Sequence, residues 1–184
     1  MIFHETGWLD VAFGRWLEAS TEIRARLVAS SIRAVTGVGA PLRRDAIDRL
    51  IAGLAEKDGR GTLGHAIFTR QGERLRIMRE TRHLPAPVEL AGERELLWDN
   101  RFFIRFGEKN VPFFIAPAGA DCVSRLPKKL RRKGEIPSTA LLGMPALRQK
   151  GCDEWQHMLA IGEAGELKWS FHPARAFTGV SFMH

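Results

Sequence analysis

The residues whose types and spacing most clearly predict chemistry form a basic segment in the second half of the chain. Six of the nine residues from Arg125 to Lys133 are lysine or arginine, and none is acidic. Cations at this density suit phosphate contacts, because each neutralised phosphate releases counterions and adds affinity without base readout. A solvated loop held open by Pro127 explains the same composition, so both interpretations stay open. The cations that would hold phosphates are Lys128, Lys129, Arg131, Arg132 and Lys133.

A second arrangement of cations and an aromatic ring falls on an expected strand. Arg101, Phe103 and Arg105 alternate along the chain, so they would share one strand face. On an exposed face, a base could stack on the ring while the guanidinium groups pair with phosphates. Charges placed on a sheet to prevent edge aggregation produce the same pattern, so this alternative also stays open.

Catalytic motifs are absent from the sequence. No Gly-x-Ser-x-Gly elbow is present, and the glycine pair Gly37 and Gly39 follows an expected helix instead of preceding one. We therefore predict no catalytic residue in this chain, and an independent small hydrolase finds no motif support.

The two cysteines predict neither a disulfide framework nor a typical metal site. Cys122 and Cys152 are far apart in sequence and are expected to be reduced. A zinc site built from these two together with His157 and His172 would lack the short-spaced ligand pair typical of structural zinc. No metal site is therefore predicted.

Composition limits the class of protein. The 184 residues carry a formal net charge of +7, with 45% hydrophobic and 27% charged residues. These values are typical of a soluble globular chain of one or two small domains. No apolar run approaches the roughly 20 residues that cross a bilayer, and the first residues do not resemble a signal peptide. A cytoplasmic location without membrane contact is expected.

The elements that must position these residues change character near residue 58. Residues 21–36 carry apolar side chains three or four apart, between a predicted N-cap at Ser20 and a stop at Gly37. A second helix is predicted over 42–54. Residues 7–17 suit either a short helix or an extended entry strand, and a helix from about Val11 is favoured. Residues 1–58 are therefore expected to form a helical hairpin or small bundle.

Beyond residue 58 the apolar period falls to two, which predicts strands. Residues 59–184 are expected to form a β-rich antiparallel domain with one or two helices, giving an α+β chain. Strands are predicted over 63–69, 74–79, 95–99, 101–106, 112–117, 156–161, 166–171 and 177–182, and a helix over 137–148.

Several short motifs occur in a familiar order. They are Pro41-Leu42-Arg43-Arg44, Gly61-Thr62-Leu63-Gly64, Arg79-Glu80, the run from Glu95 to Phe102, and Met144-Pro145-Ala146-Leu147. This order resembles the C-terminal, non-catalytic region of bacterial tRNA(Ile)-lysidine synthetases of the alphaproteobacterial type. The family commonly has glycine after Trp-Asp; here the residue is Asn100, which also tolerates a left-handed backbone.

The resemblance implies a role in tRNA modification. The parent enzymes adenylate C2 of cytidine 34 of tRNA(Ile) with ATP and then attach the lysine ε-amine. That chemistry, with its ATP and Mg, belongs to an N-terminal ATP-pyrophosphatase domain whose Ser-Gly-Gly-x-Asp-Ser loop this sequence lacks. The chain would therefore be an inactive fragment or separately encoded part that holds no cofactor. Its expected partners are tRNA(Ile) and the missing domain, with residues 1–58 as a substrate-binding segment and Arg101 approaching the RNA.

A different class of function stays open alongside this one. The aromatic residues Phe102, Phe103 and Phe106 could instead meet another protein, as in an interaction or dimerisation module without an RNA role. Such a module would self-associate independently of salt. The sequence leaves the oligomeric state open.

Overall fold

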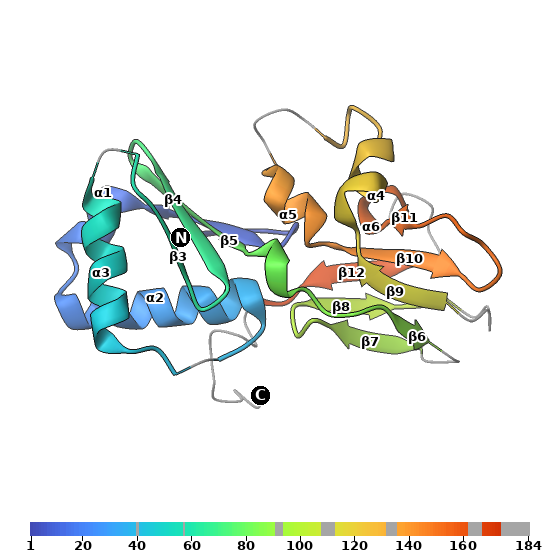
Figure 1. Ribbon diagram of the computed structural model, residues 1–184, viewed down its shortest axis with the longest axis horizontal. Helices are drawn as coiled ribbons and strands as arrows, with labels where there is room; N and C mark the ends of the chain where they lie inside the picture. The colour runs from blue at the N-terminus through green and yellow to red at the C-terminus, as the bar shows by residue number, and fades with distance from the viewer. Residues whose placement is uncertain are drawn as a thin grey trace.

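The computed structural model describes residues 1–39, 41–56, 58–90, 94–107, 113–131, 136–161 and 167–173. These residues form two lobes that lie side by side (Figure 1). The described part contains three sheets, in all of which neighbouring strands are antiparallel. No helix in these ranges has the length and apolar character needed to span a bilayer.

The first lobe is a five-stranded sheet with helices packed against one face. Its strand order is β1-β2-β5-β4-β3, so the first two strands of the chain pair with a later hairpin. The strands are β1 (Ile2–His4), β2 (Trp8–Ala12), β3 (Arg60–Leu63), β4 (Ala66–Gln71) and β5 (Arg74–Arg79). The helices are α1 (Phe13–Glu18), α2 (Thr21–Thr36) and α3 (Arg44–Ala55).

Local signals place α2 where the sequence predicts it. The Ser20 hydroxyl accepts a hydrogen bond from the Ile23 backbone N–H at 3.3 Å, as an N-cap does. Gly37 ends the helix in the left-handed conformation, with φ of 72°. Val28, Ile32 and other apolar residues of the helix are buried in the first core.

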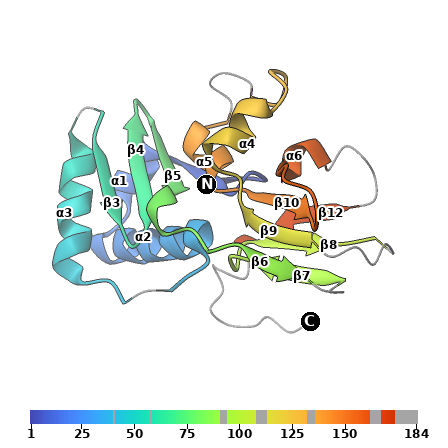
Figure 2. The same cartoon turned by 45° about the vertical axis from the view of Figure 1, so that its right-hand side comes forward.

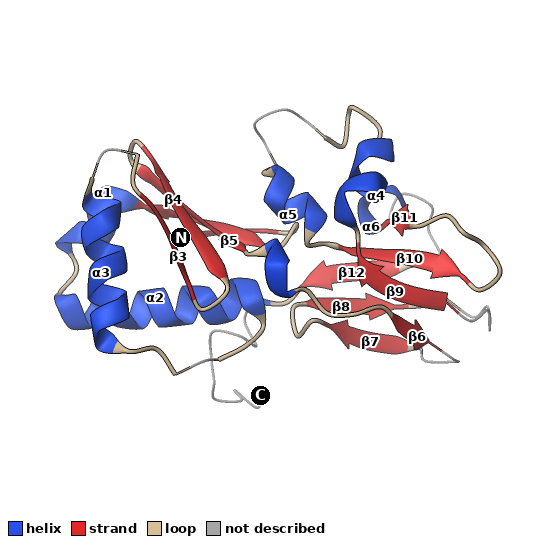
Figure 3. Cartoon of the chain, in the orientation of Figure 1, coloured by secondary structure: helices blue, strands red, loops and turns tan. Residues whose placement is uncertain are grey.

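The expected N-terminal helical hairpin or bundle, and with it the predicted fold class, is wrong. The chain begins with strands β1 and β2, and helices occur among the strands in both lobes (Figure 3). The first core joins residues on both sides of the expected boundary at residue 58, for example Leu54 and Phe68. The apolar stripes of α2 and α3 were correctly predicted, but a stripe does not reveal whether it meets a helix or a sheet.

The second lobe contains two smaller sheets. Their strand orders are β11-β10-β9-β6 and β12-β8-β7. The strands are β6 (Val88–Leu90), β7 (Glu95–Trp98), β8 (Phe102–Arg105), β9 (Phe113–Pro117), β10 (Pro145–Gln149), β11 (Gln156–His157) and β12 (Lys168–Phe171). The helices are α4 (Gly119–Arg125), α5 (Ser138–Leu142) and α6 (Met158–Ile161).

Two predictions for this lobe need correction. The helix expected over 137–148 is only the five-residue α5, because Pro145 begins strand β10 within that range. Proline lacks a backbone N–H, which suits the first residue of a strand. The strand expected over 156–161 is the short β11 followed by α6. The strand expected over 177–182 lies outside the described residues.

Helix α5 lies between the lobes, next to β5 and α4 (Figure 2). Its Ala140 shares a small buried cluster with Trp8 of β2 and Met78 of β5. The second lobe therefore partly covers the face of the first sheet that lies opposite α2 and α3.

Candidate nucleic-acid interface

The open part of the first sheet offers a polar surface. Alternate strand residues point to opposite faces, and Leu9 and Leu75 are buried in the core shared with α2 and α3. Their neighbours Asp10, Arg74 and Arg76 therefore lie on the other face. The register places Arg60 there as well, because Arg60 pairs with Thr69 and Thr69 pairs with Arg76.

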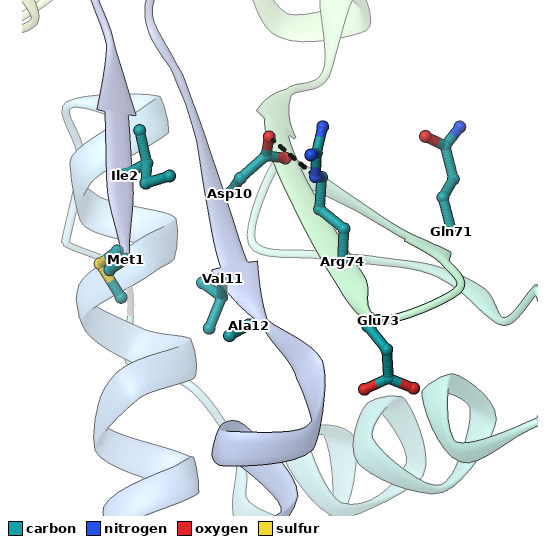
Figure 4. Close-up of a pocket in the computed structure, with 8 residues that line it drawn as sticks. All are labelled: Met1, Ile2, Asp10, Val11, Ala12, Gln71, Glu73 and Arg74. Atoms are coloured by element: carbon teal, nitrogen blue, oxygen red, sulfur yellow. Dashed lines mark ion pairs between the residues drawn. The ribbon is translucent and has the colours of Figure 1, made fainter.

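Two adjoining hollows lie on this face. The larger has a volume of about 580 Å³, and its lining includes His4, Trp8, Asp10, Arg76 and Ile136. The second, of about 470 Å³, is drawn in Figure 4, where the side chains of Asp10 and Arg74 point toward each other from neighbouring strands. Both residues line both hollows, so the two form one continuous surface.

An aromatic stack borders the larger hollow. The His4 ring lies parallel to the Trp8 ring with 3.5 Å between centroids, and the Arg76 guanidinium lies 4.4 Å from the centre of the Trp8 ring. The Trp8 indole N–H donates to the Thr6 hydroxyl at 2.7 Å, which fixes the ring. Burial lowers the pKa of His4, although Asp10 opposes the shift. A neutral imidazole stacked in this way presents a flat surface suited to a base.

Basic and acidic side chains share this face. Asp10 is buried, and its carboxylate lies 3.3 Å from Arg76 Nε and 3.7 Å from Arg74 Nε. The Arg74 side chain is 62% exposed, so Asp10 does not remove it from solvent. Arg60 is also exposed. Glu5 and Glu73 also line the hollows, so the three arginines share this surface with three acidic residues.

The basic segment predicted from the sequence follows α4. Arg125 ends that helix and pairs with Glu154 at 3.2 Å, while Lys128 and Lys129 are exposed in the turn that follows. Leu130 packs against the second core and so anchors this turn. Arg131 is half-buried, and Arg132 and Lys133 lie outside the described residues.

The basic segment leads along the chain toward the open sheet face. Ile136, five residues after Arg131, lines the larger hollow. Five residues span at most about 17 Å, so Arg131 lies within that distance of the hollow's wall. No family model, curated protein or solved structure matches this chain.

Arg101 does not belong to this surface. Its side chain is 2% exposed, its Nε donates to Asp99 at 2.8 Å, and its Nη2 donates to the Gly143 carbonyl at 3.0 Å. Burial lowers the pKa of Arg101 to about 10 against the opposing effect of Asp99, so the guanidinium stays charged at neutral pH. The predicted approach of Arg101 to RNA does not fit this position, because the side chain is occupied inside the protein.

The aromatic surface of the alternative interpretation is also largely inside. Phe102 is fully buried, and Phe103 and Phe106 are half-buried. Arg105, on the same strand, is exposed and pairs with Glu95 at 2.7 Å. These rings therefore supply little free apolar surface to a protein partner.

The sequence analysis missed the open face and one side-chain cluster. The two cysteines are free thiols, Cys122 buried and Cys152 exposed.

Within the described ranges, the side chains of His65, Glu80 and His83 bring metal-ligating atoms close together. The spacing of Glu80 and His83, three apart, was a signal in the sequence. No local signal indicates which face of the first sheet is left open.

Proposed function

We propose that this chain binds RNA, with the open face of the first sheet and the basic segment as its contact surface. The observation that carries the proposal is the His4 ring stacked on Trp8, with the Arg76 guanidinium and the exposed Arg74 side chain on the same sheet face. Single-stranded RNA loops expose bases that can stack on an accessible ring such as His4, while cations hold the backbone. Lys128 and Lys129, in the turn after α4, add exposed cations that would hold phosphates.

The resemblance to lysidine synthetases makes tRNA(Ile) the proposed RNA. In this interpretation the chain is a tRNA-binding part that helps to position the anticodon loop. Ligation of lysine to C2 of cytidine 34 then takes place on a separate ATP-pyrophosphatase domain, which supplies the ATP and Mg. The phosphate contacts of the basic segment would hold the tRNA without reading its sequence.

Binding of tRNA(Ile) across a salt series tests the proposal. The unmodified chain should bind more weakly as salt rises, and it should prefer tRNA(Ile) to an RNA duplex. Reversing two exposed charges, Lys128→Glu with Lys129→Glu, should weaken binding. It should also reduce the slope of log affinity against log salt by about 0.7 to 0.9 for each phosphate that is no longer neutralised.

A matched variant controls for net charge. Arg26→Glu with Arg43→Glu makes the same change in charge at two exposed residues, one in α2 and one just before α3, that line neither hollow. Its tRNA binding should stay close to that of the unmodified chain. Equal losses in the two variants, or no tRNA binding at low salt, would contradict the proposal. Self-association that is independent of salt would favour the interaction module instead.

A further inference from the structure

We propose that His65, Glu80 and His83 form a binding site for a divalent transition metal, with Zn²⁺ as its best fit. The site lies at the edge of the first lobe and shares no residue with the proposed RNA surface. Its donors are two imidazoles and one carboxylate.

The hairpin of β3 and β4 brings His65 into place. Gly64 and His65 form the two-residue turn between these strands, with φ values of 55° and 65°. Strand β5 lies beside β4, and the register pairs Ala66 with Arg79. Glu80, the next residue, donates its backbone N–H to the His65 carbonyl at 2.8 Å. The strand pairing therefore holds these two residues together through their backbones.

A short turn of 3-10 helix supplies the third donor. Residues Thr81–His83 follow Glu80 directly, and residues three apart lie on the same side of such a turn. The carbonyl of His83 accepts a hydrogen bond from Arg79 Nη2 at 2.8 Å. Because Arg79 is buried, this bond anchors the turn to the protein interior.

The donor atoms are close enough to share one ion. One ligand atom from each residue lies within 4.8 Å of the other two, and the two imidazole rings meet edge to face at 4.5 Å between centroids. Bonds of 2.0 to 2.2 Å in a tetrahedral site place ligand atoms about 3.3 to 3.6 Å apart. Rotation of the exposed histidine side chains is sufficient to close that difference.

His65 occupies a turn position and its side chain is free to bind a ligand. A left-handed φ is uncommon outside glycine and favours glycine or asparagine in a hairpin turn. In the described part of the chain, the side chains of His65, Glu80 and His83 form no ion pair and no side-chain hydrogen bond. Their ring nitrogens and carboxylate oxygens are therefore available to a ligand.

The donor set selects the class of metal. Two imidazoles with one carboxylate suit zinc, whereas calcium and magnesium prefer oxygen ligands throughout. Three protein ligands leave one tetrahedral position for water, as in zinc sites that are open to solvent. Both histidines are exposed, so an ion has direct access.

Titration of the full chain with Zn²⁺ tests the site, using metal-free protein without a histidine tag. We expect one ion per chain by calorimetry and a rise in Tm with added Zn²⁺, because the ion binds only the folded arrangement. Co²⁺ as a substitute should give the visible absorption bands of a tetrahedral site. No binding of Zn²⁺, or a cobalt spectrum of six-coordinate geometry, would overturn the proposal.

Single substitutions assign the ligands. Each of three variants, His65→Asn, Glu80→Gln and His83→Asn, should weaken Zn²⁺ binding at least about 10-fold. A loss of this size already follows when a residue that merely hydrogen-bonds to a metal ligand is changed. Asparagine at position 65 keeps a residue that tolerates the turn. His172→Asn is the matched control, because His172 contacts Ser170 and Phe103 on the other lobe and should leave Zn²⁺ affinity unchanged. If all three ligand variants, each folded by circular dichroism, bind as the unmodified chain does, the site is disproved.

Discussion

A single carboxylate joins two buried guanidinium groups where the lobes meet. Asp99 of the second lobe lies 3.0 Å from Arg79 Nη2 and 2.6 Å from Arg101 Nη2, and all three side chains are at most 8% exposed. Arg79 also donates to the carbonyl of Thr36 at 2.7 Å. Burial lowers the pKa of both arginines and raises that of Asp99, while the attraction between the opposite charges opposes these shifts. The cluster therefore has one carboxylate for two cations, and Asp99 is the counterion of both.

Removing that carboxylate should be costly. We expect Asp99→Asn to lower the free energy of unfolding by about 3 to 5 kcal/mol, because two buried cations lose their counterion. Asparagine accepts the left-handed backbone at this position, where φ is 52°, so the loss reports on charge. Urea unfolding measures it. Glu95→Gln, which breaks the exposed pair with Arg105, should cost less than about 1 kcal/mol; equal costs would contradict the argument.

At the scale of the elements, Gly37 both ends α2 and allows a turn of the second lobe to pack against the helix end. A Cβ on Gly37 would overlap the Asp99 carbonyl oxygen and lie 2.9 Å from Asn100 Cβ. The glycine therefore allows the β7–β8 turn to approach the helix end. Its left-handed φ and this close approach both require the absence of a side chain.

Two glycine substitutions separate these requirements. Gly72→Ala, at φ of 59° with no atom near the new Cβ, should cost only the backbone penalty of about 1 to 2 kcal/mol. Gly37→Ala should cost about 2 to 5 kcal/mol, because overlap with the other lobe is added. Thermal or urea unfolding of the two variants measures the difference. Similar values for both would show that the lobes do not pack closely at this point.

Local signals decided which elements could be predicted from the sequence. Ser20 and Gly37 mark the limits of α2, and Asn100 has the left-handed φ of 54° that its type allows. Near Val11, five residues of β2 were too few to distinguish a strand from a helix by period. For the site, the basic segment is visible as composition, whereas the open sheet face depends on where the second lobe covers the first.

On the scale of the whole molecule, the two cores are joined by apolar and ionic contacts. Trp8 and Met78 of the first lobe pack with Ala140 of α5, and Arg101 donates to the Gly143 carbonyl just beyond that helix. Each lobe therefore completes part of the other's buried surface. Loss of one lobe would expose buried cations and apolar side chains of its neighbour.

We accordingly expect the lobes to unfold together. Calorimetry should give one transition whose calorimetric and van't Hoff enthalpies agree. Hydrogen exchange of the Val35 and Ile104 amides, one in each core, should report similar opening free energies. Two resolved transitions, or opening energies that differ by several kcal/mol, would mean that the lobes are independent.

The strand order of the first sheet has a consequence for behaviour at high concentration. Its outer strands are its shortest, with three residues in β1 and four in β3. Short outer strands offer few backbone groups to an approaching chain, so they are poor templates for adding further strands. Ile2 on β1 is 62% exposed, and this apolar side chain favours association with another chain. Resistance to fibril formation should therefore depend more on the length of β1 than on its composition.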